Sequence, residues 1–521
     1  MAKLELYDTT LRDGAQSEGI SFSVADKLKI CERLDMLEID YIEGGWPGAN
    51  PKDLELFKKA KSLRLKRSEL VAFGSTRHSG SKAAQDKILK GLLNAETKII
   101  TIFGKSWDLH VRDVLKVELD DNLRMVSDSV SFLRSKGRRV FFDAEHFFDG
   151  YRTNKEYALK ILKAAAEAGA ERLVLCDTNG GTMTTELFKV IEDVRASVKT
   201  PLGIHSHNDS GMAVANSIAA VQAGCIQVQG TINGYGERCG NANLVTIIGN
   251  LKLKLGVDCV SGIALKELTE VSRYIAEICN MKVQDNEPFV GHSAFAHKAG
   301  VHVNAILKNP RTYEHVDPNS VGNRRRLLVS ELSGKSTILK KAEEMDVDLG
   351  KSPEKSKKIL KALQELEHEG YHFESAEASL ELLVKRIMKK FVDFFQLEDF
   401  RVIVEKKGGK MSSEATIKLK VGKELEHTAA LGDGPVNALD SALRKALKKF
   451  FPGIAQMHLT DYKVRVLDEK EGTAARVRVL IQSQDKNDSW WTIGVSENII
   501  DASWKALVDS VEYKLLKDSR K

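Results

Sequence analysis

The chain has 521 residues, 42% of them hydrophobic, and a formal net charge of +6. This length accommodates two or three domains, each with its own core, and so small a charge argues against a nucleic-acid partner. The six cysteines are scattered, form no CxxC pair and fit a reducing cytoplasm. The sequence shows neither a signal peptide nor an apolar run of roughly 18 residues, so we expect a soluble protein without a targeting segment.

Short apolar runs alternate with longer amphipathic segments through the first part of the chain. The amphipathic segments predict helices, the first three over 24–37, 54–63 and 83–93. Eight strand-helix units within about 250 residues predict a closed (β/α)8 TIM barrel, with a doubly wound open sheet as the runner-up. The predicted strands are Leu4–Tyr7, Tyr41–Glu43, Leu70–Phe73, Ile99–Phe103, Arg139–Asp143, Arg172–Cys176, Leu202–His205 and Cys225–Ile232.

The alternation stops between about residues 256 and 345, which indicates a connecting region with functional loops. The following segment, 351–394, is rich in Lys, Glu and Leu at helical spacing and is interpreted as solvated helices between two domains. We therefore expect a catalytic barrel over 1–265, linker and helical subdomains over 266–395, and a C-terminal α+β domain over 396–521.

The C-terminal domain contains a weak internal duplication. Two strands and a helix are predicted over 415–421, 428–431 and 436–450, and the same order recurs over 475–481, 491–495 and 500–515. The repeated unit offers no obvious acid, base or metal-ligand set. Its role is interpreted as assembly or small-molecule regulation.

Reactive side chains follow the predicted barrel strands at the end where barrel active sites lie. His205 and His207 are two residues apart on one strand, so both imidazoles point to the same side and can converge on one ion. Asp13 and Asn241 follow the neighbouring strands one and eight and can add oxygen ligands. This mixed set suits Zn, Mn, Mg or Co and does not choose among them.

Two further residues at the strand ends can bind an anionic substrate. Arg12 presents a permanent cation that can stabilise an alkoxide on a substrate carbonyl, although an ion pair with Glu43 or Glu237 is compatible with the same position. Thr178 can donate its hydroxyl group to a substrate carboxylate, or simply cap the next helix.

Three motifs, in this order, resemble one known family of enzymes. They are DTTLRDGAQ at residues 8–16, HSHND at 205–209 and GYGERCGN at 234–241. Together they resemble the 2-isopropylmalate synthase, homocitrate synthase and citramalate synthase family over nearly the whole chain. The segment 41–51, YIEGGWPGANP, and the long C-terminal part are most similar to the citramalate synthase branch.

The resemblance assigns roles to the residues at these positions. It implies that Asp13, His205, His207 and Asn241 hold a divalent metal, that Arg12 polarises the ketone of a 2-oxo acid, and that Thr178 binds its carboxylate. It also implies catalytic roles for Glu145, His302 and Tyr313, with either Glu145 or His302 as the base that activates acetyl-CoA. Asn304 stands where several relatives have an acid, which leaves its part in proton transfer open.

Within this family, the citramalate branch implies condensation of acetyl-CoA, the co-substrate, with pyruvate to give (R)-citramalate, an entry into isoleucine synthesis. It further implies a homodimer and feedback inhibition by isoleucine through the C-terminal domain. The alternatives are a larger 2-oxo acid, a related acyl-CoA lyase, or an amino-acid sensor. A biotin-dependent carboxyltransferase is disfavoured because no predicted strand ends in a lysine that could be carbamylated.

Overall fold

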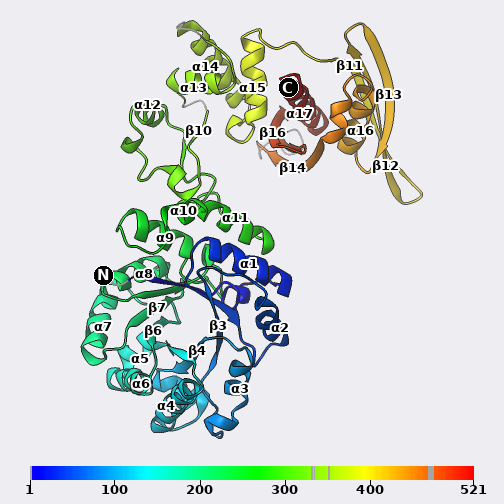
Figure 1. Cartoon of the computed structure of the whole chain (residues 1–521). Coiled ribbons are helices and arrows are strands. Elements are labelled where there is room, and N and C mark those ends of the chain that lie inside the picture. The colour runs from blue at the N-terminus through cyan, green and yellow to red at the C-terminus, as the bar shows by residue number, and fades with distance from the viewer. Residues whose placement is uncertain (1–2, 330–332, 334, 350–352, 468–474, 521) are drawn as a thin grey trace. The chain divides into compact units, whose positions relative to one another are not determined.

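The computed structural model describes residues 3–329, 333, 335–349, 353–467 and 475–520. Its chain divides into two compact units (Figure 1). The first comprises Met1–Phe295 with His315–Arg325, and the second comprises Ala296–Glu314 with Arg326–Lys521. The predicted domain limits at 265 and 395 remain a prediction. Each unit is described below by itself.

The first unit is a closed barrel of eight parallel strands in the order β1 to β8 (Figure 1), which confirms the predicted fold. All eight strands lie within or next to the predicted segments. The eighth is shorter than expected, at four residues. The strands are β1 Glu5–Asp8, β2 Tyr41–Gly45, β3 Glu69–Ser75, β4 Ile99–Lys105, β5 Arg139–Glu145, β6 Arg172–Asp177, β7 Leu202–Ser206 and β8 Gln227–Gly230.

Helices surround this barrel, and local sequence sets where they begin. At the first helix, the Ser23 hydroxyl accepts from the Asp26 amide while the Asp26 carboxylate accepts from the Ser23 amide, which forms a capping box. The helices of this unit are α1 Val24–Met36, α2 Pro51–Ala60, α3 Lys87–Asn94, α4 Leu119–Ser135, α5 Phe147–Thr153, α6 Lys155–Glu167, α7 Thr184–Ser197, α8 Ala213–Gln222, α9 Leu244–Leu253, α10 Gly262–Lys266 and α11 Leu268–Ile278. No described helix of the chain is long and apolar enough to cross a membrane.

The barrel has two separate apolar cores because successive residues of a strand face opposite sides of the sheet. Leu6, Ile42 and Ala72 belong to the large cluster between strands and helices. The alternate positions form an interior cluster of Tyr7, Tyr41, Val71, Ile99 and Phe141. At the carboxyl ends of the strands, polar side chains line the barrel interior, and the candidate site lies there.

The second unit begins with short elements and a three-helix cluster. The elements are β9 Ala296–His297, α12 Gly300–Lys308, β10 Arg326–Leu327, α13 Lys335–Glu344, α14 Pro353–His368 and α15 Glu377–Ile387. The helices expected over 351–394 are present as α14 and α15, but they are not solvated on all sides. Ile359 and Leu363 of α14 and Leu380 and Val384 of α15 are buried in one core that also includes Ile493 of the C-terminal domain.

The C-terminal domain contains the predicted duplication, but each repeat has three antiparallel strands and one helix where two strands and one helix were expected. The first repeat is β11 Gln396–Lys407, β12 Lys410–Val421, β13 Glu424–Gly432 and α16 Pro435–Leu447. The second is β14 His458–Val466, β15 Val477–Gln484, β16 Ser489–Ser496 and α17 Ile499–Ser519. Sequence analysis missed the first strand of each repeat. Both helices share one core with the inner faces of the two sheets.

Candidate active site and regulatory pocket

Three of the predicted metal ligands converge at the carboxyl end of the barrel. Asp13 follows β1, and His205 and His207 lie at the end of β7; all three are buried, and their ligand atoms lie within 4.8 Å of one another. The Nε2 atoms of the two imidazoles are 3.3 Å apart. Asp13 Oδ2 lies 3.4 Å from Nε2 of His205 and 3.9 Å from Nε2 of His207.

Asn241 is held beside this cluster by its backbone. It forms an isolated antiparallel bridge with His207, and its side-chain amide donates to the carbonyl of Tyr235. The glycines of the GYGERCGN loop are needed for this turn. A Cβ atom on Gly240, whose φ is +87°, would lie 2.0 Å from the Gly234 carbonyl oxygen, and one on Gly236 would lie 2.2 Å from Asn241 Nδ2.

The unsatisfied atoms of the cluster fit a cation. Asp13 Oδ1 and Asn241 Oδ1 are buried oxygen atoms without a hydrogen-bond partner among the described residues. Leaving such atoms unsatisfied costs free energy, and two imidazole nitrogens with two oxygens form a donor set that divalent transition metals accept. Asp13, His205, His207 and Asn241 therefore fit the metal that the sequence predicts.

The protonation states of two of these residues, Asp13 and His207, suit metal binding. Burial raises the pKa of the Asp13 carboxyl, but the charge of Arg12 and the contact with His205 outweigh it, so that pKa lies below its usual range. Burial, together with the neighbouring His205, lowers the pKa of His207 to about 3. A carboxylate and a neutral imidazole, the forms that ligate metals, are thus present at neutral pH.

Arg12 is fixed next to the cluster. Its Nε donates to Glu43 Oε1 at 2.5 Å, its Nη1 lies 3.4 Å from Asp13 Oδ2, and its Cζ lies 3.8 Å from the centroid of the Phe73 ring. Of the two partners considered from the sequence, Glu43 is the observed one, while Glu237 lies beside Arg238. The guanidinium is therefore held by a carboxylate on one side and a ring face on the other.

Sequence analysis did not single out the buried network behind Arg12. The Tyr7 hydroxyl donates to Glu43 Oε2 at 2.6 Å and lies 2.8 Å from the Thr101 hydroxyl. Tyr7, Glu43 and Thr101 come from β1, β2 and β4, so they span the barrel interior. Both oxygens of the Glu43 carboxylate are thus occupied, which leaves this side chain one orientation.

Glu145 ends β5, as expected, and its carboxylate pairs with the ammonium group of Lys105 at the end of β4. The sequence expectation that no barrel strand ends in a lysine is therefore wrong. It placed the end of this strand at Phe103, two residues too early. The Ser106 amide and hydroxyl both donate to the Glu145 carbonyl, which anchors the backbone of the candidate base.

Thr178 follows β6, and its hydroxyl oxygen accepts a hydrogen bond from the backbone, which leaves the hydroxyl group able to donate its hydrogen. The amide of His146 donates to Thr178 Oγ1 at 2.9 Å. His146 adopts a left-handed backbone conformation with φ of 59°, so this hydrogen bond supports a strained turn after β5. The oxygen is used as an acceptor, and the hydroxyl remains able to donate to a substrate carboxylate, as the sequence predicts.

His302 and Tyr313 belong to the second unit. Their rings stack with centroids 4.1 Å apart and planes inclined by 28°. His302 lies on α12, as does Asn304, and Tyr313 follows the short helix η5 Pro310–Thr312. The structure brings these two predicted residues together within this unit, and their catalytic roles stay predictions.

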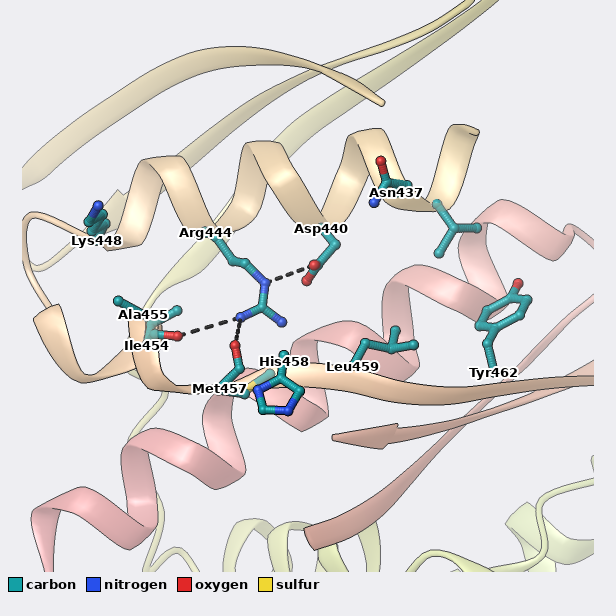
Figure 2. Close-up of a pocket in the computed structure, with 11 residues that line it drawn as sticks. Asn437, Asp440, Arg444, Lys448, Ile454, Ala455, Met457, His458, Leu459 and Tyr462 are labelled. Carbon is teal, nitrogen blue, oxygen red and sulfur yellow. Dashed lines mark hydrogen bonds and ion pairs between the residues drawn. The ribbon is translucent and has the colours of Figure 1, made fainter. Parts of the chain in front are cut away.

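The C-terminal domain contains a cavity of about 540 Å³ that sequence analysis did not predict (Figure 2). Arg444 of α16 crosses it: Nε donates to Asp440 Oδ2 at 2.7 Å, and Nη1 donates to the carbonyls of Met457 and Ile454 at 2.6 and 3.5 Å. Asp440 Oδ1 has no hydrogen-bond partner among the described residues. The other lining residues are Val436, Asn437, Lys448, Ala455, His458, Leu459 and Tyr462.

Comparison with known proteins assigns a family to each part of the chain. The HMGL-like family matches residues 3–275, which form the barrel. A homocitrate synthase post-HMGL domain-like family matches residues 289–370, and the LeuA allosteric (dimerisation) domain matches residues 374–515. The cavity around Arg444 therefore lies in the part of the chain that matches the LeuA allosteric (dimerisation) domain.

Full-length relatives decide the family. The chain is 54% identical to the (R)-citramalate synthase of Aquifex aeolicus over 99% of its own length and 98% of that protein, and 54% identical to that of Geobacter sulfurreducens with the same coverage. The chain belongs to the (R)-citramalate synthase family. A 2-isopropylmalate synthase of Methanocaldococcus jannaschii is 31% identical over 99% of the chain. The resemblance drawn from the three motifs is thus confirmed, and the chain is an acyltransferase-type condensing enzyme.

Proposed function

We propose that this chain condenses acetyl-CoA with pyruvate and water to give (R)-citramalate and CoA, the first step of the pyruvate route to isoleucine. The observation that carries the proposal is the match to (R)-citramalate synthases at 46 to 54% identity over almost their whole length. Proteins that bear the name 2-isopropylmalate synthase match at 31%. The reaction therefore uses the smallest acid among the alternatives.

Four residues of the barrel would hold the divalent metal: Asp13, His205, His207 and Asn241. Such an ion, whether Mn, Zn, Mg or Co, supplies a Lewis acid that polarises the ketone of the 2-oxo acid. Arg12 lies 3.4 Å from Asp13 Oδ2 and places a second positive charge where the ketone oxygen becomes negative. The Thr178 hydroxyl donates to the carboxylate of pyruvate, which fixes the orientation of its ketone.

The carbon-carbon bond forms between the two substrates after a proton is lost. A base, Glu145 or His302, removes a proton from the methyl group of acetyl-CoA, and the enolate carbon attacks the ketone carbon of pyruvate. The former ketone oxygen gains a proton and becomes the tertiary hydroxyl group. Water then cleaves the thioester, which releases CoA and makes the sequence irreversible. Tyr313, stacked on His302, would orient that imidazole.

Release of the CoA thiol by the purified protein tests the reaction. Pyruvate, 2-oxoisovalerate and 2-oxoglutarate are each supplied with acetyl-CoA, with and without a chelator. Thiol release with pyruvate alone that the chelator abolishes is the expected result. A preference for a larger acid would assign another member reaction, and no release with any acid would favour a lyase or a sensor.

We further propose that isoleucine inhibits the enzyme by binding in the cavity around Arg444. The free oxygen of Asp440 can accept from the ammonium group of an amino acid, and the guanidinium of Arg444 can donate to its carboxylate (Figure 2). Val436, Ile454 and Leu459 line the cavity with apolar surface that suits a branched aliphatic side chain.

A charge-neutral variant separates inhibition from catalysis. Asp440→Asn removes the charge that attracts the ammonium group, so the isoleucine concentration for half-inhibition should rise by about 10-fold to 100-fold. Glu414→Gln, an exposed carboxylate of β12 outside the cavity, is the matched control and should inhibit as the wild type does. Unchanged inhibition of Asp440→Asn would place the effector elsewhere.

The active form is proposed to be a cytoplasmic homodimer. The match to a dimerisation domain over 374–515 supports the dimer, and the absence of disulfides among the six cysteines supports the reducing compartment. Light scattering of the protein as it elutes from a size-exclusion column measures the mass of the assembly directly. A mass of one chain at the concentrations of the activity assay would contradict the dimer.

A further inference from the structure

A hydrogen-bonded chain runs from the metal-site histidine His205 into the barrel interior. His205 Nδ1 lies 3.0 Å from Gln229 Oε1, and Gln229 Nε2 donates to Asp143 Oδ1 at 3.2 Å. His205, Gln229 and Asp143 come from β7, β8 and β5, and each is no more than 5% exposed. Neither Gln229 nor Asp143 has a part in the reaction described so far.

The orientation of the Gln229 amide is determined by its partners. Gln229 Nε2 also donates to Gln227 Oε1 at 3.5 Å, and Gln227 Nε2 in turn donates to Glu5 Oε2 at 3.2 Å. The Glu5 carboxylate is paired with Arg172 and can only accept a hydrogen bond, so it fixes the Gln227 amide and leaves Gln227 Oε1 to accept. Nε2 of Gln229 must therefore face Gln227 and Asp143.

This direction determines which nitrogen of His205 carries hydrogen. Because Gln229 presents its carbonyl oxygen, Nδ1 of His205 must be the donor of their hydrogen bond. In the neutral imidazole the lone pair then lies on Nε2. Nε2 is the atom that faces Asp13 Oδ2 at 3.4 Å and His207 Nε2 at 3.3 Å.

We propose that Gln229, oriented by Gln227 and Asp143, is a positioning residue that fixes the metal-binding tautomer and the ring orientation of His205. Ligating histidines depend on such an acceptor, whose removal typically weakens metal affinity by about 10-fold to 100-fold. Here the acceptor is an uncharged amide that takes its direction from the Glu5 carboxylate through Gln227. The inference rests on the proposed metal site and concerns how this chain prepares it.

Zinc affinity of the metal-stripped protein, measured by competition with a chromogenic chelator, tests the proposal without any assay of turnover. Gln229→Leu removes the acceptor at similar volume and should weaken Zn²⁺ binding by about 10-fold to 100-fold. Gln229→Glu keeps an oxygen in the same place and should retain an affinity at or above that of the wild type. If Gln229 only filled space in the barrel interior, Gln229→Leu and Gln229→Glu would not differ in this way in their Zn²⁺ affinity.

Gln227→Leu removes one acceptor of the Gln229 amide but leaves Asp143 and the contact between Gln229 and His205 in place. Its loss of Zn²⁺ affinity should therefore be smaller than that of Gln229→Leu. Equal affinities of Gln229→Leu and the wild type would overturn the proposal, as would an equal loss in Gln229→Leu and Gln229→Glu. Should Gln229→Leu not fold, Gln229→Met, which also lacks the acceptor but has an unbranched side chain, is expected to bind Zn²⁺ more weakly than the wild type.

The wild-type titration separates the two levels of inference. A wild-type protein that binds no Zn²⁺ would refute the proposed metal site and, with it, the role of Gln229. A wild-type protein that binds Zn²⁺ as tightly as Gln229→Leu does would refute the role of Gln229 alone.

Discussion

Arg12 forms an ion pair with the buried Glu43 whose Nε to Oε1 distance is 2.5 Å, and this pair sets the position of positive charge beside the proposed metal ligands. The carboxylate is itself held by the Tyr7 hydroxyl, and the guanidinium lies over the Phe73 ring. The cation can thus neither rotate away nor exchange its partner without breaking contacts in the barrel interior. A transition-state stabiliser gains from such preorganisation because nothing needs to rearrange during the reaction.

Replacement of the Arg12 guanidinium should therefore lower kcat more than it weakens the binding of the substrates. Arg12→Lys keeps the charge but loses the planar contact with Phe73 and the directed bond to Glu43. We expect kcat to fall by about 10²-fold to 10³-fold, the typical cost of one oxyanion donor, while KM for acetyl-CoA changes little. Steady-state kinetics with both substrates measures this, and a loss confined to KM would contradict the assigned role.

The proposed metal ligands permit a second test. Asp13→Ala and His207→Ala each remove one ligand, so both should lose bound metal and turnover while they retain the circular dichroism spectrum of the folded barrel. The Cys239→Ala variant changes an exposed residue of the GYGERCGN loop and serves as the control. Wild-type turnover in thoroughly metal-stripped protein would exclude the metal from the reaction.

Most of the barrel could be predicted from sequence because its strands are buried on both sides and read as continuous apolar runs. The strands β11 and β14 were missed. No described residue of either one is fully buried, so both lack the apolar runs of the barrel strands. The segment 462–466 of β14 does alternate between apolar and polar residues, but it was not recognised as a strand, and pairing with β12 and β15 establishes both strands.

The candidate site was predictable where residues of reactive type end or follow a strand, as Asp13, His205 and Asn241 do. Glu43 was named as one of two possible partners of Arg12, while Gln229 and Lys105 were missed. Gln229 lies inside a strand, where a polar residue has no partner that sequence can identify. Lys105 was missed because the strand was ended too early. Such supporting contacts depend on which strands face each other across the barrel.

Thr178 offers a prediction about substrate binding. Its oxygen accepts from the His146 amide, so only its hydrogen is available for the carboxylate of pyruvate. Thr178→Val removes this donor and should lower kcat/KM for pyruvate by about 10-fold to 100-fold, as expected for a hydrogen bond to a charged group. Thr178→Ser keeps the hydroxyl and should behave like the wild type. Equal kinetics of the Val and Ser variants would show that the hydroxyl does not contact the substrate.

The pairing of Glu512 with Arg386 predicts how stability depends on pH. Glu512 of α17 is 2% exposed, and burial raises its pKa to about 7 although Arg386 acts in the opposite direction. Between pH 4.5, the usual pKa of this group, and about 7, the folded protein holds a proton that the unfolded chain has released. The free energy of unfolding must therefore fall as pH rises through this range.

Glu512→Gln removes this titration. Relative to the wild type, the variant should gain stability between pH 5 and pH 8, by at most about 3 kcal/mol, because the wild type alone bears the cost of ionising a buried carboxyl group. Asp485→Asn is the control: the pKa of Asp485 is lowered to about 2, so both its folded and unfolded values lie below this range and its effect should not change with pH. Melting temperatures of the three proteins at both pH values measure the difference. A Glu512→Gln effect that is the same at pH 5 and pH 8 would show that Glu512 is already ionised in the folded protein, with Arg386 outweighing the cost of burial.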